Sequence, residues 1–400
     1  MKKIILGFVA MGLAFSSMAD DKVVIPDSTG FKFKDKKIVK TTPVKDQFKS
    51  GTCWCYSTNT FFESEILRLT GKEIHLSEGF VVNHCYKDKA IKYVRMDGKM
   101  NYAQGGATAD VPYVWQTYGM VPNEVYTGMT YGDKKFNHSE MADVLANYVG
   151  VINKVQQKKL TPAWIDGLQG LIDAYMGKIP ETFDYEGKTY TPKSFAESLP
   201  INIDDYVAIG SFTHHPFYKP FVLEVADNWL WATMQNVPIE ELMEIVSYAI
   251  DNGYPVAWAS DVSEPGFKYR KGYAVLPEDK EVPDLKGSDM ARWLQMSTKD
   301  REAEKWDIKG PVKEQVVTQE SRQKMFDNKE TTDDHGMVIM GKAVDQKGNR
   351  YFKVQNSWDT NQLYNGFFYV SEPFFLAKTM DILVHKDAIP AHIASKMGIK

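Results

Sequence analysis

The sequence predicts an α+β protein with two unlike lobes, one helical and one built on an antiparallel sheet. The first half of the chain carries a long stretch of helical apolar spacing that starts near residue 53. The last quarter instead carries short apolar and aromatic runs separated by turn residues, which is typical of antiparallel strands. Helices and strands that are segregated along a chain favour the α+β class, and 400 residues suffice for two lobes.

The clearest predicted helices lie at residues 53–69, 110–118 and 239–252. In the first of them Phe62 and Ile66 recur at helical spacing, and a glycine follows the last periodic residue, as is common after a helix. The second is stopped by a glycine and a proline, and the third ends in an Asp-Asn-Gly sequence. These breaks give each predicted helix a definite end.

The middle of the chain, residues 148–309, is predicted to mix helical stretches with loops. Within it, the charged segment 279–286 is interpreted as a surface loop. This long region separates the predicted helical lobe from the predicted sheet.

The C-terminal quarter is predicted to form strands at residues 337–344, 351–354 and 366–370. The turn residues 345–349, Asp-Gln-Lys-Gly-Asn, join the first two strands. If these strands pair through that turn, their far ends lie side by side.

Composition narrows the class of function. A hydrophobic content of 43% and a charged content of 25% are typical of a soluble globular protein. The net charge of -4 gives no cationic surplus, so nucleic-acid binding is not expected. Apart from the N-terminus, no stretch is long and apolar enough to predict stable membrane insertion.

The N-terminus is predicted to be a secretory signal, residues 1–19. Lys2 and Lys3 precede a mostly apolar segment, 4–15, which is shorter than a membrane span. Ser17 and Ala19 place small residues where a signal peptidase reads, so cleavage is expected after Ala19. The mature chain, residues 20–400, is then expected in the periplasm of a bacterium or outside the cell.

The segment around Cys53 carries the predicted chemistry. A thiol in the first turn of a helix lies near unpaired backbone N–H groups and the positive end of the helix dipole, which favour the thiolate. Gly51 allows a sharp turn before the helix. Gln47 can bring a side-chain amide to the same end, where it and the Cys53 N–H would form an oxyanion hole.

A nucleophilic thiol needs a base, and the base needs an orienting group. His335 begins the first predicted C-terminal strand, and Asn356 follows the second. Pairing of these strands would bring Asn356 next to His335, where its amide oxygen can accept the imidazole N–H. Trp358 could then shield this hydrogen bond from water. The sequence therefore predicts a Cys53, His335 and Asn356 triad assisted by Gln47.

Each of these residues alone has an ordinary structural explanation, and only the combination is specific. A zinc site from Cys53, Cys55, His84 and Cys85 is the chemical competitor, but the spacing is not that of a structural zinc site. His214-His215 has no carboxylate pair or third histidine beside it in sequence and is interpreted as packing or loop structure. No metal ligand is therefore predicted.

Three cysteines are an odd number for an exported protein. If Cys53 is the nucleophile, it must remain reduced. Cys55 and Cys85 could then form a disulfide or could both be buried thiols, and the sequence leaves both alternatives open.

The active-site segments resemble those of papain-like cysteine peptidases, most closely the bleomycin hydrolase and aminopeptidase C branch. The residues that carry the resemblance are Gln47, Gly51-Thr52-Cys53-Trp54, His335-Gly336 and Asn356-Ser357-Trp358. Wider similar segments are Leu76-Ser77-Glu78, Gly105-Gly106, 118–122, 218–229 and 317–320, so the resemblance runs from about residue 45 to 384. The 282 positions from Cys53 to His335 exceed the roughly 130 to 150 of papain, as the insertions of this branch would require.

The resemblance implies a papain-like two-lobed fold with large insertions. The helical lobe would carry the nucleophile helix, the β lobe would carry His335 and Asn356, and the insertion-rich middle would span about 148–309. It also implies hydrolysis of peptide substrates without a cofactor, a substrate cleft lined by Gly105, Gly106, Trp54 and Trp358, and a homo-hexameric ring.

In this branch the C-terminal tail lies in the cleft, and its terminal carboxylate holds the free amine of the substrate. By resemblance the tail here is 389–400, and Lys400 would carry that role. The tail lacks the usual ending of the branch. Two further departures are Ser50, where papain has a disulfide cysteine, and Asp359, where a glycine normally follows Asn-Ser-Trp.

Three functions remain open from the sequence. The first is an aminopeptidase that measures its substrate with the tail. The second is an endopeptidase or oligopeptidase with an open cleft. The third is a non-catalytic peptide-binding protein on the same scaffold, which the presence of all four active-site residues disfavours. Side-chain specificity and oligomeric state are not encoded in these motifs.

Overall fold

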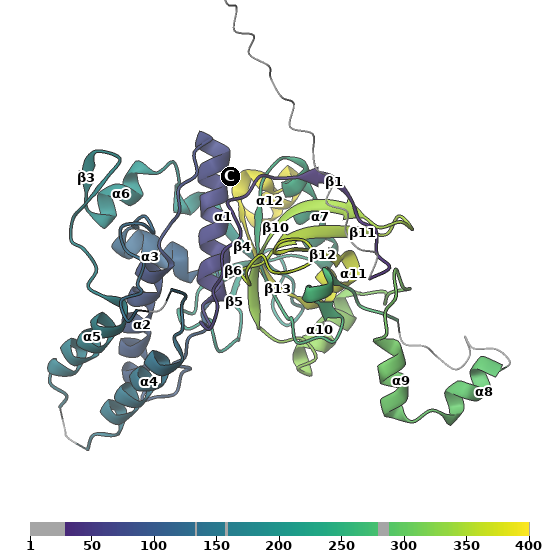
Figure 1. The fold of residues 1–400 in the computed structure, drawn as a ribbon, viewed down its shortest axis with the longest axis horizontal. Helices are drawn as coiled ribbons and strands as arrows, with labels where there is room; N and C mark the ends of the chain where they lie inside the picture. Colours follow the sequence, from purple (N-terminus) through teal and green to yellow (C-terminus); the bar gives the residue numbers. More distant parts are fainter. Residues whose placement is uncertain (1–28, 133, 157–158, 279–287, 400) are drawn as a thin grey trace, which may run out of the picture.

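The computed structural model describes residues 29–132, 134–156, 159–278 and 288–399. The predicted signal, 1–19, and the predicted loop, 279–286, lie outside these residues. The described chain forms two lobes that meet along the long helix α1, Cys53–Thr70 (Figure 1). The predicted division into a helical lobe and a sheet lobe is therefore confirmed.

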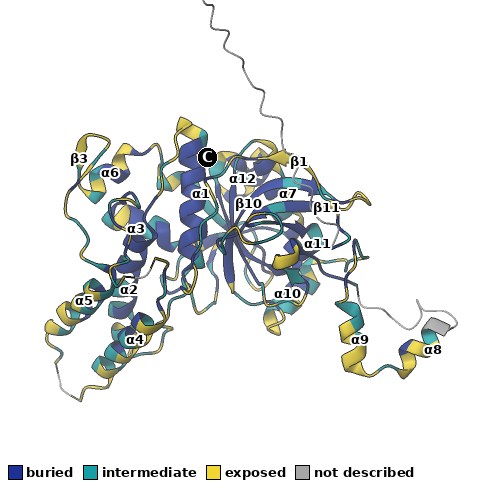
Figure 2. Cartoon of the chain, viewed as in Figure 1, coloured by how far each residue is buried: buried dark blue, intermediate teal, exposed yellow. Residues whose placement is uncertain are grey.

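The helical lobe is formed by the first half of the chain. Its further elements are α2 (Glu78–Arg95), α3 (Asp110–Tyr118), α4 (Ser139–Lys154), α5 (Ala163–Met176), the hairpin β2 (Phe183–Tyr185) and β3 (Lys188–Tyr190), and α6 (Pro192–Ser198). Helix α1 contacts α2 and α3 on one side and the sheet on the other, so it is buried over most of its length (Figure 2). The helix that carries the predicted nucleophile therefore lies at the interface between the two lobes.

The predicted helix 53–69 is confirmed to within one residue. Its end is fixed by Gly71, which adopts a left-handed conformation at φ 73° and donates its N–H to Leu67 O over 2.8 Å. The predicted helix 110–118 is α3, and the predicted helix 239–252 is α7, Ile239–Asp251. Helices α3 and α7 were predictable because each buries one face and exposes another, whereas α1 is buried nearly all round and was predictable from its apolar spacing and the glycine that follows it.

The β lobe is one large, mostly antiparallel sheet. The strands in spatial order are β5 (Pro220–Val222), β6 (Thr233–Asn236), β4 (Tyr206–Gly210), β13 (Thr379–His385), β7 (Val256–Ser260), β10 (His335–Val344), β11 (Arg350–Gln355), β12 (Phe367–Ser371), β9 (Tyr273–Ala274) and β8 (Phe267–Lys268). A further strand, β1 (Lys34–Ile38), also pairs with β10. Only the pairs β4–β6 and β9–β12 are parallel among the described strands.

The prediction for the middle of the chain is incomplete. Residues 148–309 supply helices and loops, but they also supply β4 and the central strand β7. All five residues of β7, Val256–Ser260, are buried, because the strand is covered on both faces. Such a strand has no alternation of apolar and polar residues, which is why the sequence pattern did not reveal it.

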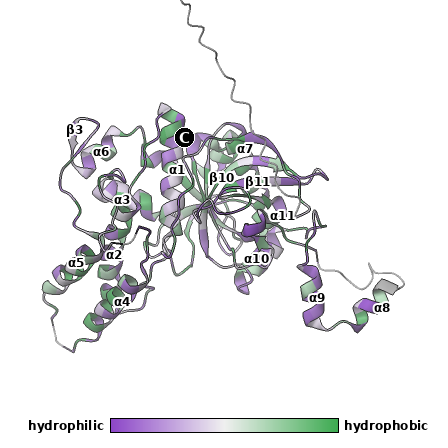
Figure 3. Cartoon of the chain, viewed as in Figure 1, coloured by the Kyte–Doolittle hydropathy of each residue, from purple (hydrophilic) through white to green (hydrophobic). Residues whose placement is uncertain are grey.

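Further helices cover the sheet or extend from it. They are α7, α10 (Gln319–Asp327), α11 (Glu372–Lys378) and α12 (Ala391–Met397), with short 3-10 turns at Ile203–Asp205, Tyr269–Lys271 and Lys386–Ala388. Helices α8 (Ser288–Gln295) and α9 (Thr298–Lys305) form an arm that projects from the β lobe, and α9 is largely hydrophilic (Figures 1 and 3). None of the helices in the described part of the chain combines the length and apolarity needed to cross a bilayer.

Candidate active site

A cavity of about 390 Å³ lies where the two lobes meet. Most of the residues that the sequence singles out line it: Cys53, Gln47, Trp54, Gly105, Gly106, His335 and Trp358. Asn356 lies behind His335 and contacts it directly. The structure therefore brings the predicted nucleophile, base and orienting residue together.

Cys53 is the first residue of α1, and its sulfur lies beside the strand that carries the histidine. The Sγ lies 3.9 Å from the carbonyl oxygen of Asp334. The hydroxyl of Thr52, the residue before the helix, does not cap it but hydrogen-bonds Ser50 Oγ over 2.7 Å. Thr52 O accepts the N–H groups of Cys55 and Tyr56 over 2.9 and 3.2 Å, but the Cys53 N–H donates to no backbone acceptor in the described chain, so it is available to an oxyanion in the cavity.

His335 and Asn356 meet because of the register of β10 and β11. Val338 of β10 pairs with Gln355 of β11, which places the next residue, Asn356, beside the start of β10. The His335 Nε2–H donates to Asn356 Oδ1 over 2.7 Å. The ring of Trp358 lies 4.5 Å from the imidazole ring and covers it, as the sequence predicts.

Burial shifts both reacting groups toward their neutral forms. It raises the pKa of the Cys53 thiol to about 11, an effect that the N–H groups of Gly336 and Trp54 oppose. It also lowers the pKa of His335 to about 4, although the hydrogen bond to Asn356 and the charge of Asp334 act in the opposite direction. A thiolate and an imidazolium formed together attract each other, so the low-cost route to the nucleophile is proton transfer within the pair.

Gln47 connects the two lobes beside the nucleophile. Its backbone N–H donates to Ser357 O over 2.9 Å, and its Oε1 accepts a 2.7 Å hydrogen bond from Ser357 Oγ. Its Nε2 donates one hydrogen to Ser50 O over 2.8 Å, which leaves a second N–H on the amide. Because the side chain is buried at the cavity wall, that N–H has a fixed position near Cys53.

Gly105 and Gly106 form part of the cavity wall, and neither position has room for a side chain. A Cβ on Gly106 would lie 2.4 Å from an oxygen of Asp110. Trp54 Nε1 donates to Gln104 O over 3.0 Å, and the ammonium of Lys89 donates to Gly105 O from behind the wall. The backbone of this segment is thus held against the cavity, where an extended peptide could approach it.

Gly336 fixes the distance between the histidine strand and the nucleophile helix. A Cβ at this position would lie 2.4 Å from Ser57 Oγ and 3.3 Å from Ser57 Cβ. We expect Gly336→Ala to push β10 away from α1 and to lower kcat/KM about 100-fold, because displacements of about 1 Å have such effects. Hydrolysis assays of this variant, and of one that also carries Ser57→Ala, test the prediction. Removing Ser57 Oγ should restore part of the rate, and a single variant with undiminished activity would refute the argument.

The cavity also contains carboxylates that the sequence analysis missed. Asp227, Asp333 and Asp381 line it from three separate parts of the chain. No local motif joins them, since they are brought together only by the fold. Asp381 could have been recognised from the sequence as unusual, because it stands within the apolar strand β13. All but one of the residues of this strand are buried.

All three cysteines are free thiols. Cys55 and Cys85 are buried, and burial raises the pKa of both thiols well above the ordinary value. They are therefore inert buried thiols, whereas Cys53 alone opens into the cavity.

The alternative zinc site is not formed by the residues that the structure describes. His84 stacks on Tyr118 with a ring separation of 3.9 Å, and burial lowers its pKa to about 3. Within the described ranges, the only group of three possible ligands is His214, His215 and Glu224.

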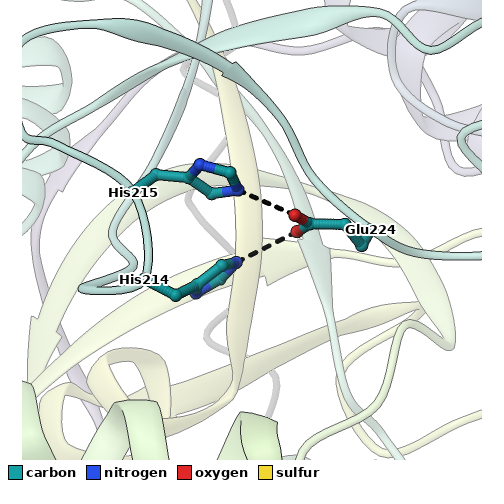
Figure 4. Close-up of side chains that lie close together, drawn as sticks. All are labelled: His214, His215 and Glu224. Carbon is teal, nitrogen blue, oxygen red and sulfur yellow. Dashed lines mark hydrogen bonds and ion pairs between the residues drawn. The ribbon is translucent and has the colours of Figure 1, made fainter.

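That group is held together by hydrogen bonds (Figure 4). The Nε2 atoms of His214 and His215 lie 3.0 and 2.8 Å from the two oxygens of Glu224. Gln323 Oε1 accepts the Thr213 N–H, so its Nε2 must donate, over 2.9 Å, to His214 Nδ1. The proton of neutral His214 is thereby placed on Nε2, the atom that faces Glu224. This arrangement favours the interpretation of His214-His215 as loop structure.

The C-terminal tail packs away from the cavity as far as the structure describes it. Ile393 and Met397 of α12 are buried in the core of the β lobe, and Ile399 packs against the same core. Among described residues that line the cavity, none follows Asp381. The family-based expectation of a tail in the cleft is thus not met by residues 389–399. Lys400 lies outside the described residues, and its role stays a prediction.

Asp359, which stands where a glycine is usual, keeps the backbone conformation that glycine favours. Its φ is 65°, in the left-handed region that aspartate tolerates better than most residues. Its carboxylate lies 3.1 Å from Lys135 Nζ, which also pairs with Asp46 over 2.6 Å. The turn after Trp358 is therefore retained despite the substitution.

Comparisons with known proteins agree with this geometry. The model of the papain family of cysteine proteases matches residues 26–195, and that of the peptidase C1-like family matches residues 283–399. Aminopeptidase G of Lactobacillus delbrueckii subsp. lactis is 24% identical, with 86% of this chain and 81% of the relative covered. Aminopeptidase C of Lactococcus lactis subsp. cremoris is 21% identical, with 87% and 81% covered.

The fold has a counterpart among solved structures. PepW from Lactobacillus rhamnosis superposes with a TM-score of 0.68 over 91% of this chain and 84% of that chain, at 17% identity. This likeness shows the fold. The matching family models and the aminopeptidase relatives indicate the family. Together these findings support the assignment of the chain to the papain-like cysteine peptidases of the aminopeptidase C branch, and hence a cysteine-type peptidase.

Proposed function

We propose that this protein is an aminopeptidase that removes residues from the free N-terminus of peptides, with Cys53 as nucleophile, His335 as base and Asn356 as orienting residue. The observation that carries the proposal is the convergence of these residues and the Gln47 amide on one cavity between the lobes. A buried cysteine or a turn asparagine would not by itself require these neighbours.

The proposed reaction follows from the positions of these groups. His335 takes the proton of Cys53, and Sγ attacks the scissile carbonyl carbon. The oxyanion accepts hydrogen bonds from the Cys53 N–H and the Gln47 amide. His335 then protonates the leaving amine, which departs and leaves a thioester on Cys53. Water, deprotonated by His335, hydrolyses the thioester and restores the thiol.

The names of the relatives support the choice of an exopeptidase. Proteins named aminopeptidase G and aminopeptidase C align with most of this chain. An enzyme of this kind must distinguish a free amine from a continuing peptide chain, and a closed or charged end of the cleft is the usual physical means.

A second candidate is an endopeptidase, and one observation favours it. Residues 389–399 pack on the β lobe instead of lining the cavity, so this segment does not close the cleft. A peptide could then extend past the nucleophile in both directions.

Matched fluorogenic peptides distinguish the two candidates. One peptide has a free N-terminus, the other is N-acetylated, and both are assayed in a reducing buffer. We expect at least a 10-fold higher kcat/KM for the free peptide. Equal cleavage of both peptides would support the endopeptidase. Cleavage of neither, with Cys53 shown to be reduced, would overturn the catalytic proposal and support a peptide-binding protein.

A further inference from the structure

The active-site cavity is rich in carboxyl groups. Asp227, Asp333, Asp334 and Asp381 line it, and the described lining residues include no lysine or arginine. Like charges gathered in a partly buried space repel each other and lose hydration. A cavity of this kind is suited to a positively charged ligand.

Three of the four carboxylates have oxygens left without a protein donor. Asp334 is an exception, because it accepts the N–H groups of Val262 and Ser263, both over 3.1 Å, and is fully used in the fold. Asp333 makes no hydrogen bond or ion pair with any described residue. Its carboxylate faces the cavity two positions before the catalytic histidine.

Asp381 and Asp227 each have one oxygen fixed and one free. The Thr108 hydroxyl donates to Asp381 Oδ1 over 3.1 Å, whereas Oδ2 accepts no hydrogen bond from the described residues. Asp381 is only 6% exposed and lines the cavity, so this oxygen is available to a group bound there. Asn101 Nδ2 donates to Asp227 Oδ1 over 2.9 Å, and Oδ2 lies against Gly105.

These carboxylates would be stabilised by a cation. Burial, with the charges of Asp381 and Asp227, raises the pKa of Asp333 to about 8. Burial likewise raises the pKa of Asp381 to about 6, although the Thr108 hydroxyl opposes it. The fold thus maintains a destabilised cluster next to the reacting atoms, a common property of functional sites.

We propose that Asp381 and Asp333, assisted by Asp227, bind the α-ammonium group of the substrate's first residue. The proposal rests on the aminopeptidase function proposed above and identifies the groups that recognise the free amine. An ammonium has three N–H donors, and the three carboxylates that line the cavity supply acceptors for them.

The position of the cluster favours an α-ammonium over a basic side chain. Asp333 and Asp227 both act electrostatically on the Cys53 thiol, so they lie near the scissile bond. In an aminopeptidase substrate the α-ammonium is attached to the residue whose carbonyl is attacked, so it must also lie there. A long basic side chain would place its charge farther away, toward the apolar part of the cavity formed by Leu223 and Met234.

Because the tail packs away from the cavity, the carboxylate cluster is the group of anions that the described chain offers to a bound amine. An amine in the cleft needs a fixed anion, and described residues 389–399 bring none to the cavity. Side-chain carboxylates from β13, from the segment before β10 and from the loop before β6 would then replace a chain terminus in this role.

The test uses the full-length enzyme with Asp381→Asn, Asp333→Asn and, as a matched control, Asp387→Asn. Asp387 follows β13 but lies outside the cavity. Each protein is assayed with an aminoacyl coumarin substrate, its N-acetylated form, and an N-acetylated form with an arginine side chain. We expect the ratio of kcat/KM for free over acetylated substrate to fall about 10- to 100-fold in the first two variants, mainly through KM. The ratio should not change in Asp387→Asn.

The outcomes separate the two proposals. If the unmodified enzyme prefers the free amine and both cavity variants keep that preference while remaining folded, the carboxylate assignment is wrong and the aminopeptidase function stands. If the variants lose only the cleavage of the arginine substrate, the cluster binds a basic side chain and the assignment is again wrong. If the unmodified enzyme shows no preference for the free amine, both proposals are overturned. Should one variant fail to fold, Asp227→Asn on the opposite wall provides the same readout.

Discussion

Replacing Cys53 with alanine is expected to lower kcat/KM by about 10⁴- to 10⁶-fold, the range seen when a member of a catalytic triad is removed. The reason is that no other described thiol opens into the cavity that holds His335. Hydrolysis of a free-amine peptide measures the rate. Titration with an irreversible thiol reagent counts the reactive sites and should find one per chain in the unmodified enzyme and none in the variant.

The two other cysteines provide matched controls. Cys55 and Cys85 are buried and have raised thiol pKa values, so the reagent should not reach them in the folded enzyme. Cys55→Ala and Cys85→Ala should lose some stability through a small cavity but keep one titratable thiol and most of the activity. Full activity in Cys53→Ala would disprove the assignment of the nucleophile.

Replacing Lys45 with methionine is expected to destabilise the fold by about 3–5 kcal/mol, as is typical when one partner of a buried ionic group is removed. Lys45 Nζ lies 2.5 Å from a carboxylate oxygen of Glu63 and 2.5 Å from one of Glu78. The side chains of Glu63 and Glu78 are 0% and 5% exposed, so the variant leaves Glu78 buried without a cation and Glu63 with only the His75 imidazole, 3.7 Å away. Chemical unfolding followed by tryptophan fluorescence measures the loss.

The destabilisation should depend on pH with a definite sign. Burial already raises the pKa of Glu78, and without the opposing charge of Lys45 that pKa should rise further above the roughly 4.3 of an unfolded glutamate. The folded variant then binds more protons than the unfolded chain, so its stability falls as the pH rises through that interval. The difference from the unmodified protein should therefore be smaller at pH 5 than at pH 7.5.

The control for this prediction is Lys309→Met. Lys309 pairs with Asp307 over 2.8 Å, but the side chains are 79% and 61% exposed, so little change is expected. Equal effects of the Lys45 and Lys309 substitutions, or a loss at Lys45 that does not vary with pH, would contradict the interpretation of Lys45 as the cation of a buried cluster.

Much of the helical lobe and of the catalytic constellation could be predicted from short-range patterns. Helices α3 and α7 each have one buried face, α1 has apolar residues at helical spacing, and all three are followed by a stop residue, so these signals are local. His335 and Asn356 could be placed together because a five-residue turn joins their strands and fixes the register. These features depend on local sequence, so they can be predicted from the sequence alone.

The parts that were missed depend on distant contacts. Strand β7 lies between β10 and β13, which follow it by many residues, and its fully buried sequence resembles that of a core helix as much as a strand. The carboxylates Asp227, Asp333 and Asp381 form a cluster only after β13 is inserted beside β7. The packed position of the tail likewise depends on the surface of the β lobe, which no tail motif describes.

The strand order has a consequence for when the enzyme becomes active during its synthesis. Both β7 and β1 pair with β10, which lies far along the chain. The sheet therefore cannot assemble until β10 has left the ribosome. His335 follows Cys53 by 282 positions, a delay of about 14–56 s at usual elongation rates. A nascent chain therefore carries the Cys53 thiol for this interval without the base proposed to activate it, so it is expected to hydrolyse no peptide before His335 has been synthesised.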